Sequence, residues 1–161
     1  MAELIAGTKR IGVHVSNLDA AVAEVFQLMM GVPSLPEQNL PALETEPIVT
    51  GVVGLAGALS GACILRMERP VALAMAAMLV GFSMETFDDT VKDALGEVCN
   101  MLAGAWKGKL PEISANCMLS VPAVVSGTNY ELHMQKPDFR LDRAYRFGEH
   151  VFAFSIVCDG L

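Results

Sequence analysis

A chain of 161 residues with 53% hydrophobic and 18% charged residues has the size of one domain and enough apolar side chains for a core, which excludes intrinsic disorder. Its formal net charge of −7 argues against nucleic acid as a partner, because no basic stripe can neutralise phosphates, and it disfavours an anionic membrane surface. We therefore expect a single domain over residues 1–161 with neither kind of partner.

The first predicted helix begins at Ser16 or Asn17, because either side chain can cap a helix N-terminus. The helix ends at Gly31, which is followed by Val32 and Pro33. Residues 34–47 are rich in proline and polar side chains, and we expect them to be the least structured part. The apolar residues of the helix repeat at helical spacing and form one stripe, which consists of Val22, Val25, Phe26 and Met29.

Residues Ile48–Leu55 and Gly61–Met67 predict a β-hairpin. The run Ile48–Leu65 is long enough to span a bilayer, but glycines interrupt it and its β-branched residues cluster at its front, which is typical of two buried strands joined by a turn. The N-terminus carries Glu3 and lacks a compact apolar stretch before a cleavage site, so we expect no signal peptide and a cytoplasmic protein.

Two helices are predicted after the hairpin. Pro70 suits the first turn of a helix that runs to about Val80, before Gly81. The longer helix covers residues 87–107 and ends before Pro111. Its charge order complements the helix dipole, with Asp88 and Asp89 at the N-terminal end and Lys107 and Lys109 at the other.

The rest of the chain predicts strands. Apolar and charged residues alternate over Phe139–Arg146, which is typical of a half-exposed strand. Together, the predicted helices and strands indicate an α+β fold, in which long helices pack on a mostly antiparallel β-sheet. The other predicted strands are Ile113–Ser120, Tyr130–Met134 and Val151–Val157, with a turn and a short extended piece at Val121–Gly127.

The potential metal ligands are scattered along the chain. The cysteines form no CxxC pair and each lies in an apolar segment, so we expect reduced thiols in the core. No metal site and no resident cofactor are predicted. The residues concerned are Cys63, Cys99, Cys117, Cys158, His14, His133 and His150.

The segment around Glu97 and Asn100 has two faces. Residues three apart on a helix point the same way, about 4.5 Å apart along the axis, so this pair can touch a single external object. On spacing alone, the solvated face of an amphipathic helix is the more common explanation for such a pair. The opposite face is expected to pack on the sheet through Val91, Leu95, Val98, Leu102 and Ala105.

The run from Glu97 to Gly104, Glu-Val-Cys-Asn-Met-Leu-Ala-Gly, resembles the E-x-x-N-M-x-x-G signature of the CheC/CheX phosphatases. The resemblance extends from about Pro47 to Gly127, with further motifs in the family's order. These motifs are the glycine-bearing hairpin at 54–67, the helix at 70–81 and the P-x-V-V-x-G stretch within 120–127.

Members of the CheC type carry two E-x-x-N motifs, whereas CheX-type members carry one and form dimers. This chain has one intact motif, so it resembles the CheX type, and a homodimer is implied. The nearest second candidate is Glu24-Val-Phe-Gln27.

The resemblance implies hydrolysis of the aspartyl phosphate on a CheY-like response regulator, which holds its own Mg²⁺ and lysine. Asn100 is then expected to position the attacking water, and Glu97 to pair with the regulator's lysine. The expected partner contacts are Asp93, Gly96, Met101 and Gly104, although Asp93 also suits a solvated position. The side chains of Met75, Met78 and Trp106 are expected in the core.

Two alternatives stay open. In the first, the chain is a non-catalytic binding or adaptor module that docks a receiver domain or a signalling partner through the same helix. In the second, it is a structural oligomer in which the motif is a relic. Asn100 turned inward or covered would favour the adaptor.

Overall fold

The computed structural model describes residues 1–43 and 46–161, and its described strands form one seven-stranded sheet in which every pairing is antiparallel. The strand order is β1-β6-β7-β3-β2-β4, and β5 pairs with β2 beside β4. The strands are β1 (Leu35–Glu37), β2 (Ile48–Gly57), β3 (Ser60–Glu68), β4 (Cys117–Leu119), β5 (Ala123–Gly127), β6 (Phe139–Phe147) and β7 (His150–Asp159).

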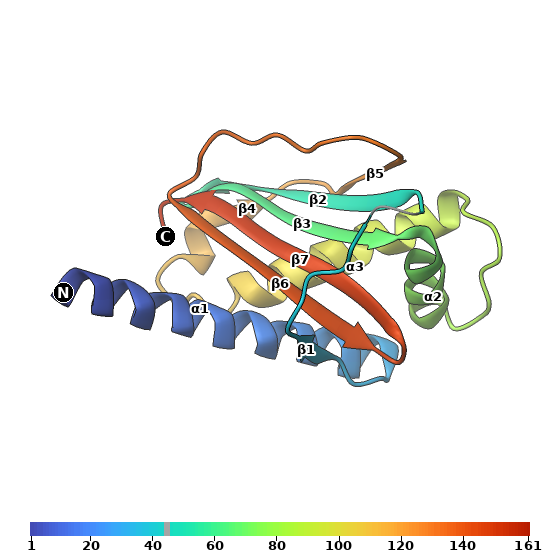
Figure 1. Cartoon of the computed structure of the whole chain (residues 1–161), viewed down its shortest axis with the longest axis horizontal. Helices are drawn as coiled ribbons and strands as arrows, with labels where there is room; N and C mark the ends of the chain where they lie inside the picture. Colours follow the sequence, from blue (N-terminus) through green and yellow to red (C-terminus); the bar gives the residue numbers. More distant parts are fainter. Residues whose placement is uncertain (44–45) are drawn as a thin grey trace.

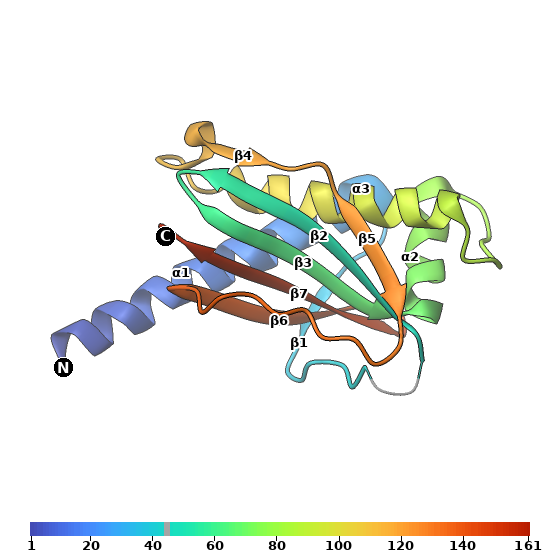
Figure 2. The ribbon, with the colours of Figure 1, turned by 90° about the horizontal axis from the view of Figure 1, so that it is seen from above.

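Three α-helices pack on one face of this sheet, as Figures 1 and 2 show. They are α1 (Ala2–Val25), α2 (Arg69–Val80) and α3 (Asp89–Lys107). Helix α3 contacts β2 and both other helices, so it lies at the centre of the helical layer. The segment between β5 and β6 crosses the opposite face of the sheet (Figure 1). This architecture confirms the predicted α+β fold.

The core lies between the sheet and the helices. Alternate residues of β3, among them Cys63, Leu65 and Met67, turn their side chains into this layer and are buried. Trp106 and Met75 are fully buried, as predicted, whereas Met78 is half-buried against the core. All four cysteines are buried free thiols. The high hydropathy of the sequence therefore belongs to a packed interior, and none of the described helices is both long and apolar enough to cross a membrane.

The hairpin β2–β3 and helices α2 and α3 confirm the sequence prediction. Pro70 lies in the first turn of α2, and Gly81 closes it in the left-handed conformation at φ 85°. Asp88 caps α3, because its carboxylate accepts a hydrogen bond of 3.1 Å from the backbone N–H of Val91.

The predicted start of the first helix is wrong. Helix α1 begins at Ala2 instead of near Ser16 or Asn17, and its N-terminal half projects beyond the sheet (Figure 1). Residues 2–15 contain no proline to stop the helix, so the two cap-like residues lie within it.

The end of this helix contains a π turn, Phe26–Met30, which closes with a hydrogen bond from the N–H of Gly31 to the carbonyl of Phe26. Such a bond spans five residues instead of four, so the turn holds an additional residue. As a result Met30 is buried and Met29 is 52% exposed, which corrects the prediction that Met29 belongs to the apolar stripe. Gly31 ends the helix, as expected, in the left-handed conformation at φ 69°.

Two strand predictions are also wrong. Only Cys117–Leu119 of the predicted strand Ile113–Ser120 is extended, after a 3₁₀ turn at Ser114–Asn116. Residues 130–134 form no strand: β4 and β5 already occupy the outer edge of β2. The hydroxyl of Tyr130 instead hydrogen-bonds the side chain of Thr50. A short strand, Leu35–Glu37, lies in the region expected to be least structured.

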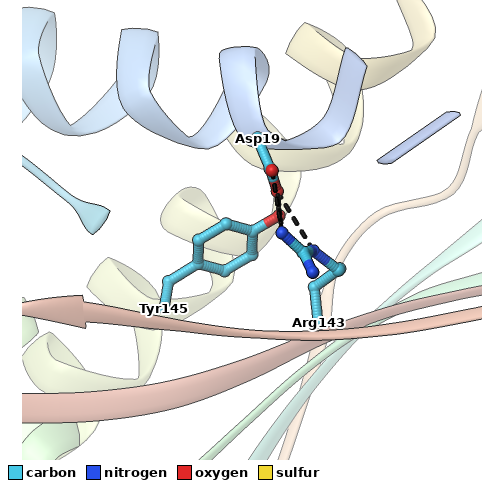
Figure 3. Close-up of polar contacts among 3 residues, drawn as sticks. All are labelled: Asp19, Arg143 and Tyr145. Carbon is cyan, nitrogen blue, oxygen red and sulfur yellow. Dashed lines mark hydrogen bonds and ion pairs between the residues drawn. The ribbon is translucent and has the colours of Figure 1, made fainter. Parts of the chain in front are cut away.

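A polar cluster fastens α1 to β6 (Figure 3). The guanidinium of Arg143 donates to the carboxylate of Asp19, with Nη2 at 2.8 Å from Oδ2 and Nε at 3.1 Å from Oδ1. Tyr145 donates its hydroxyl to Asp19 Oδ1 at 2.7 Å. Burial raises the pKa of Tyr145 above its ordinary range, and the hydrogen bond to Asp19 raises it further. This cluster fixes the position of α1 relative to the sheet.

Candidate functional site

Helix α3 carries the candidate site on a rigid base. Of the five residues predicted to face the sheet, four are at most 1% exposed, namely Val91, Leu95, Val98 and Leu102, and the fifth, Ala105, is half-buried. Burial of such side chains stabilises the helix by about 1.5–3 kcal/mol each. The opposite face of α3 is therefore held in a fixed position relative to the sheet.

Glu97 and Asn100 lie on that opposite face, one turn apart. Glu97 is exposed and Asn100 is half-buried. Asn100 lines a surface hollow, so its side chain is neither turned into the core nor fully solvated. Their positions match the predicted arrangement of a carboxylate and an amide that can reach one external object.

The four predicted partner contacts have different environments. Asp93 is exposed, whereas Met101 and Gly104 are half-buried and line the same hollow as Asn100. Gly96 is buried, and a Cβ atom built on it would lie 3.4 Å from Cγ of Pro122. The chain itself therefore makes the close approach at Gly96, and a contact of this residue with a partner stays a prediction.

The hollow beside Asn100 has a volume of about 400 Å³ and lies between the end of α1 with its π turn, the C-terminal half of α3, and β4. We call it the α1–α3 hollow. Most of its lining is apolar, and the π turn contributes two exposed side chains, Leu28 and Met29. The full lining is Glu24, Val25, Leu28, Met29, Asn100, Met101, Gly104, Ala105 and Leu119.

The predicted site did not include Leu28, Met29 or Leu119, which line this hollow. Leu28 and Met29 lie about 70 residues before Asn100, and only the packing of α1 against α3 brings them together. The one local signal is a run of three apolar residues, Leu28–Met30, at the end of the helix, which is wider than a single stripe requires.

Of the second candidate pair, Glu24 lines the hollow and Gln27 does not. Glu24 pairs with Lys109, with Lys109 Nζ at 2.8 Å from Glu24 Oε1, and this ion pair joins the end of α1 to the turn that follows α3. Gln27 is exposed within the π turn. The carboxylate of Glu24 thus has a partner within the chain.

Three of the buried thiols are unsuited to nucleophilic or metal chemistry at neutral pH. Burial raises the pKa of Cys99 to about 12 and that of Cys158 to about 11, and it raises the pKa of Cys63 well above its ordinary range. Across the part of the chain that the structure describes, no three His, Cys, Asp or Glu side chains are grouped to hold a metal ion.

Comparisons with known proteins bear on this site. A model of the family described as "Chemotaxis phosphatase CheX" matches residues 49–141, which include α3 and the hairpin β2–β3. The CheY-P phosphatase CheX of Thermotoga maritima is 27% identical over 123 residues, which cover 73% of this chain and 78% of that protein.

Two solved structures share the fold. CheX of Vibrio vulnificus superposes with a TM-score of 0.75 at 20% identity, covering 91% of this chain and 96% of that one. CheX in the CheX-CheY-BeF3-Mg+2 complex of Borrelia burgdorferi superposes with a TM-score of 0.70 at 22% identity, covering 91% and 97% of the two chains.

Proposed function

This chain belongs to the CheX family of chemotaxis phosphatases, and on that basis we propose that it hydrolyses the aspartyl phosphate of a CheY-like response regulator, with Asn100 and Glu97 as its working pair. The observation that carries the proposal is the placement of both side chains on the accessible face of α3, one turn apart, with Asn100 at the edge of an open hollow. The curated relative named CheY-P phosphatase and the CheX–CheY complex of Borrelia burgdorferi support the choice of partner.

The proposed role of Asn100 is to position water. An aspartyl phosphate is already activated, so hydrolysis requires a water molecule held in line with the P–O bond more than it requires covalent chemistry. A carboxamide donates and accepts hydrogen bonds and does not titrate, so it can orient water over a wide pH range. The rigid base of α3 suits this task, because orientation is lost when the orienting group moves.

Glu97 is proposed to pair with a lysine of the regulator. Its exposed carboxylate can form a charge-assisted hydrogen bond with an ammonium group, which would set the register of α3 on the regulator. We place the Mg²⁺ that phosphoryl transfer requires in the regulator, where it would neutralise charge on the phosphoryl oxygens. In this arrangement the regulator brings the metal ion and the phosphate, and the chain brings the amide.

The adaptor alternative predicts binding without hydrolysis. It would be favoured by an Asn100 that is turned inward, but this residue lines an open hollow. A CheX-like homodimer and a cytoplasmic location are both compatible with the proposal, and both stay predictions.

The test is loss of phosphate from a phosphorylated CheY-like regulator with Mg²⁺, with and without the purified protein. Wild type should accelerate the loss, and Asn100→Ala should reduce the acceleration on the order of 100-fold. Asn17→Ala is the matched control, since Asn17 is also a half-buried helical asparagine but lies on α1. Acceleration that survives Asn100→Ala would refute the assigned role, and binding without acceleration would favour the adaptor.

A further inference from the structure

The α1–α3 hollow lies at one end of an exposed surface that changes character along α3. The carboxylates of Asp93 and Glu97 are exposed toward the N-terminal end, and the apolar hollow begins at Asn100 and continues past Gly104. Asp93 and Gly104 are eleven residues apart, or about 16 Å along the helix axis. Asn100 lies at the junction between the acidic and the apolar parts.

The apolar part carries large apolar side chains that are exposed and do not contribute to the core. Leu28 is 80% exposed and Met29 is 52% exposed, next to the half-buried Met101 and Leu119. The π turn is the local reason, since its additional residue brings Met30 rather than Met29 to the core. Exposed large apolar side chains that share a hollow with a candidate catalytic amide indicate a contact surface.

We propose that Leu28 and Met29, together with Met101, dock the receiver domain of the phosphorylated regulator and set its affinity, a step that rests on the proposed function. The partner is a receiver domain in which a cationic side chain and an apolar patch flank the phosphorylated aspartate. The cation meets Glu97 and Asp93, the phosphate reaches Asn100, and the apolar patch enters the α1–α3 hollow.

Two properties favour this occupant over others. The hollow is continuous with Asn100, so a partner seated in it is already at the proposed reaction site. The flanking carboxylates are complementary to a cationic partner surface and would repel anionic lipid headgroups. A second copy of this chain would bring the same carboxylates and the same negative net charge of −7 to the interface.

Docking contacts of this kind act equally on the bound substrate and on the transition state. Removing them raises KM and leaves kcat unchanged, whereas removing a group that acts on the reacting atoms lowers kcat. Leu28 and Met29 are therefore expected to differ from Asn100 in the kinetic parameter that they change.

The experiment compares the double variant Leu28→Ser/Met29→Ser with Ile11→Ser. Ile11 is a matched control, because it lies on the same helix, is 52% exposed like Met29 and is far from the hollow. The double variant should raise KM for the phosphorylated regulator at least tenfold, equivalent to about 1.4 kcal/mol, with kcat unchanged. Ile11→Ser should leave both parameters unchanged.

A binding titration separates this inference from the proposed function. The protein is titrated with a beryllofluoride-activated regulator, and the double variant is also made in the Asn100→Ala background. Loss of binding on both backgrounds supports the docking surface, even if wild type shows no hydrolysis and the phosphatase proposal fails. Hydrolysis by wild type with an unchanged KM in the double variant overturns the docking surface and leaves the phosphatase proposal intact. A smaller sedimenting species for the double variant also overturns it, because the hollow would then join two copies of this chain.

Discussion

Replacement of Gly104 by alanine should make the protein more stable and less active. A Cβ atom built at this position has only one neighbour within 4 Å, Cδ1 of Leu119 at 3.9 Å, so the methyl group fits without displacing any atom. Alanine is favoured over glycine in a helix interior by about 0.5–1 kcal/mol. For a chain of this size, each kcal/mol raises Tm by about 2–4 °C.

The same methyl group would protrude into the α1–α3 hollow, beside Asn100. If the regulator approaches the helix backbone at this point, the methyl group holds it away, and kcat/KM should fall roughly tenfold. Thermal unfolding measures the first effect, and loss of phosphate from the regulator measures the second. A gain in stability together with a loss of activity is the result expected for a glycine that lets a partner approach the helix backbone.

Either of two results would refute this reasoning. A lower Tm for Gly104→Ala would show that the helix is packed more tightly there than the structure indicates. An unchanged activity would show that the regulator does not approach at Gly104. Gly96→Ala is the comparison, since its Cβ would face Pro122 instead of the hollow, and we expect a smaller gain in stability and unchanged activity. A loss equal to that of Gly104→Ala would instead make Gly96 a partner contact.

Two further predictions concern the scaffold. The pKa of Tyr145 is raised by burial above its ordinary value of 10.0, so its contribution to the free energy of unfolding is complete below that pH and declines above it. In urea unfolding, Tyr145→Phe should cost about 1 kcal/mol near neutral pH, through the lost hydrogen bond to Asp19, and should reduce the decline in alkali; an equally steep decline would contradict this. The four cysteines should react with a thiol reagent at least about 100-fold more slowly in the native protein than in denaturant, because burial encloses their thiols; rapid native labelling would contradict their placement in the core.

The parts of the fold that sequence reasoning predicted correctly are those whose signals are local. Pro70 and Gly81 bound α2, and Asp88 caps α3, each by a contact within one turn of the helix. The errors have non-local causes. Residues 130–134 alternate like a strand, yet β4 and β5 already occupy the edge of β2, and no spacing within the segment reports this.

The same division applies to the candidate site. The positions of Glu97 and Asn100 follow from the period of one helix, and the structure agrees with them. The α1–α3 hollow depends on the packing of α1 against α3 and on the π turn, and neither is encoded in the period of a single helix. The homodimer implied by the resemblance is a property of two chains, and it stays a prediction.

The number of residues in the π turn at Phe26–Met30 decides which apolar side chains are exposed beside Asn100. Insertion of one residue into an α-helix rotates everything beyond it by about 100° relative to everything before it. A single-residue deletion in this turn would therefore exchange the buried and exposed members of the apolar run while leaving the earlier turns of α1 unchanged. Variation in the length of α1 at this point, in addition to substitution on its surface, is thus a direct route by which chains of this fold can acquire or lose the apolar pair beside the amide.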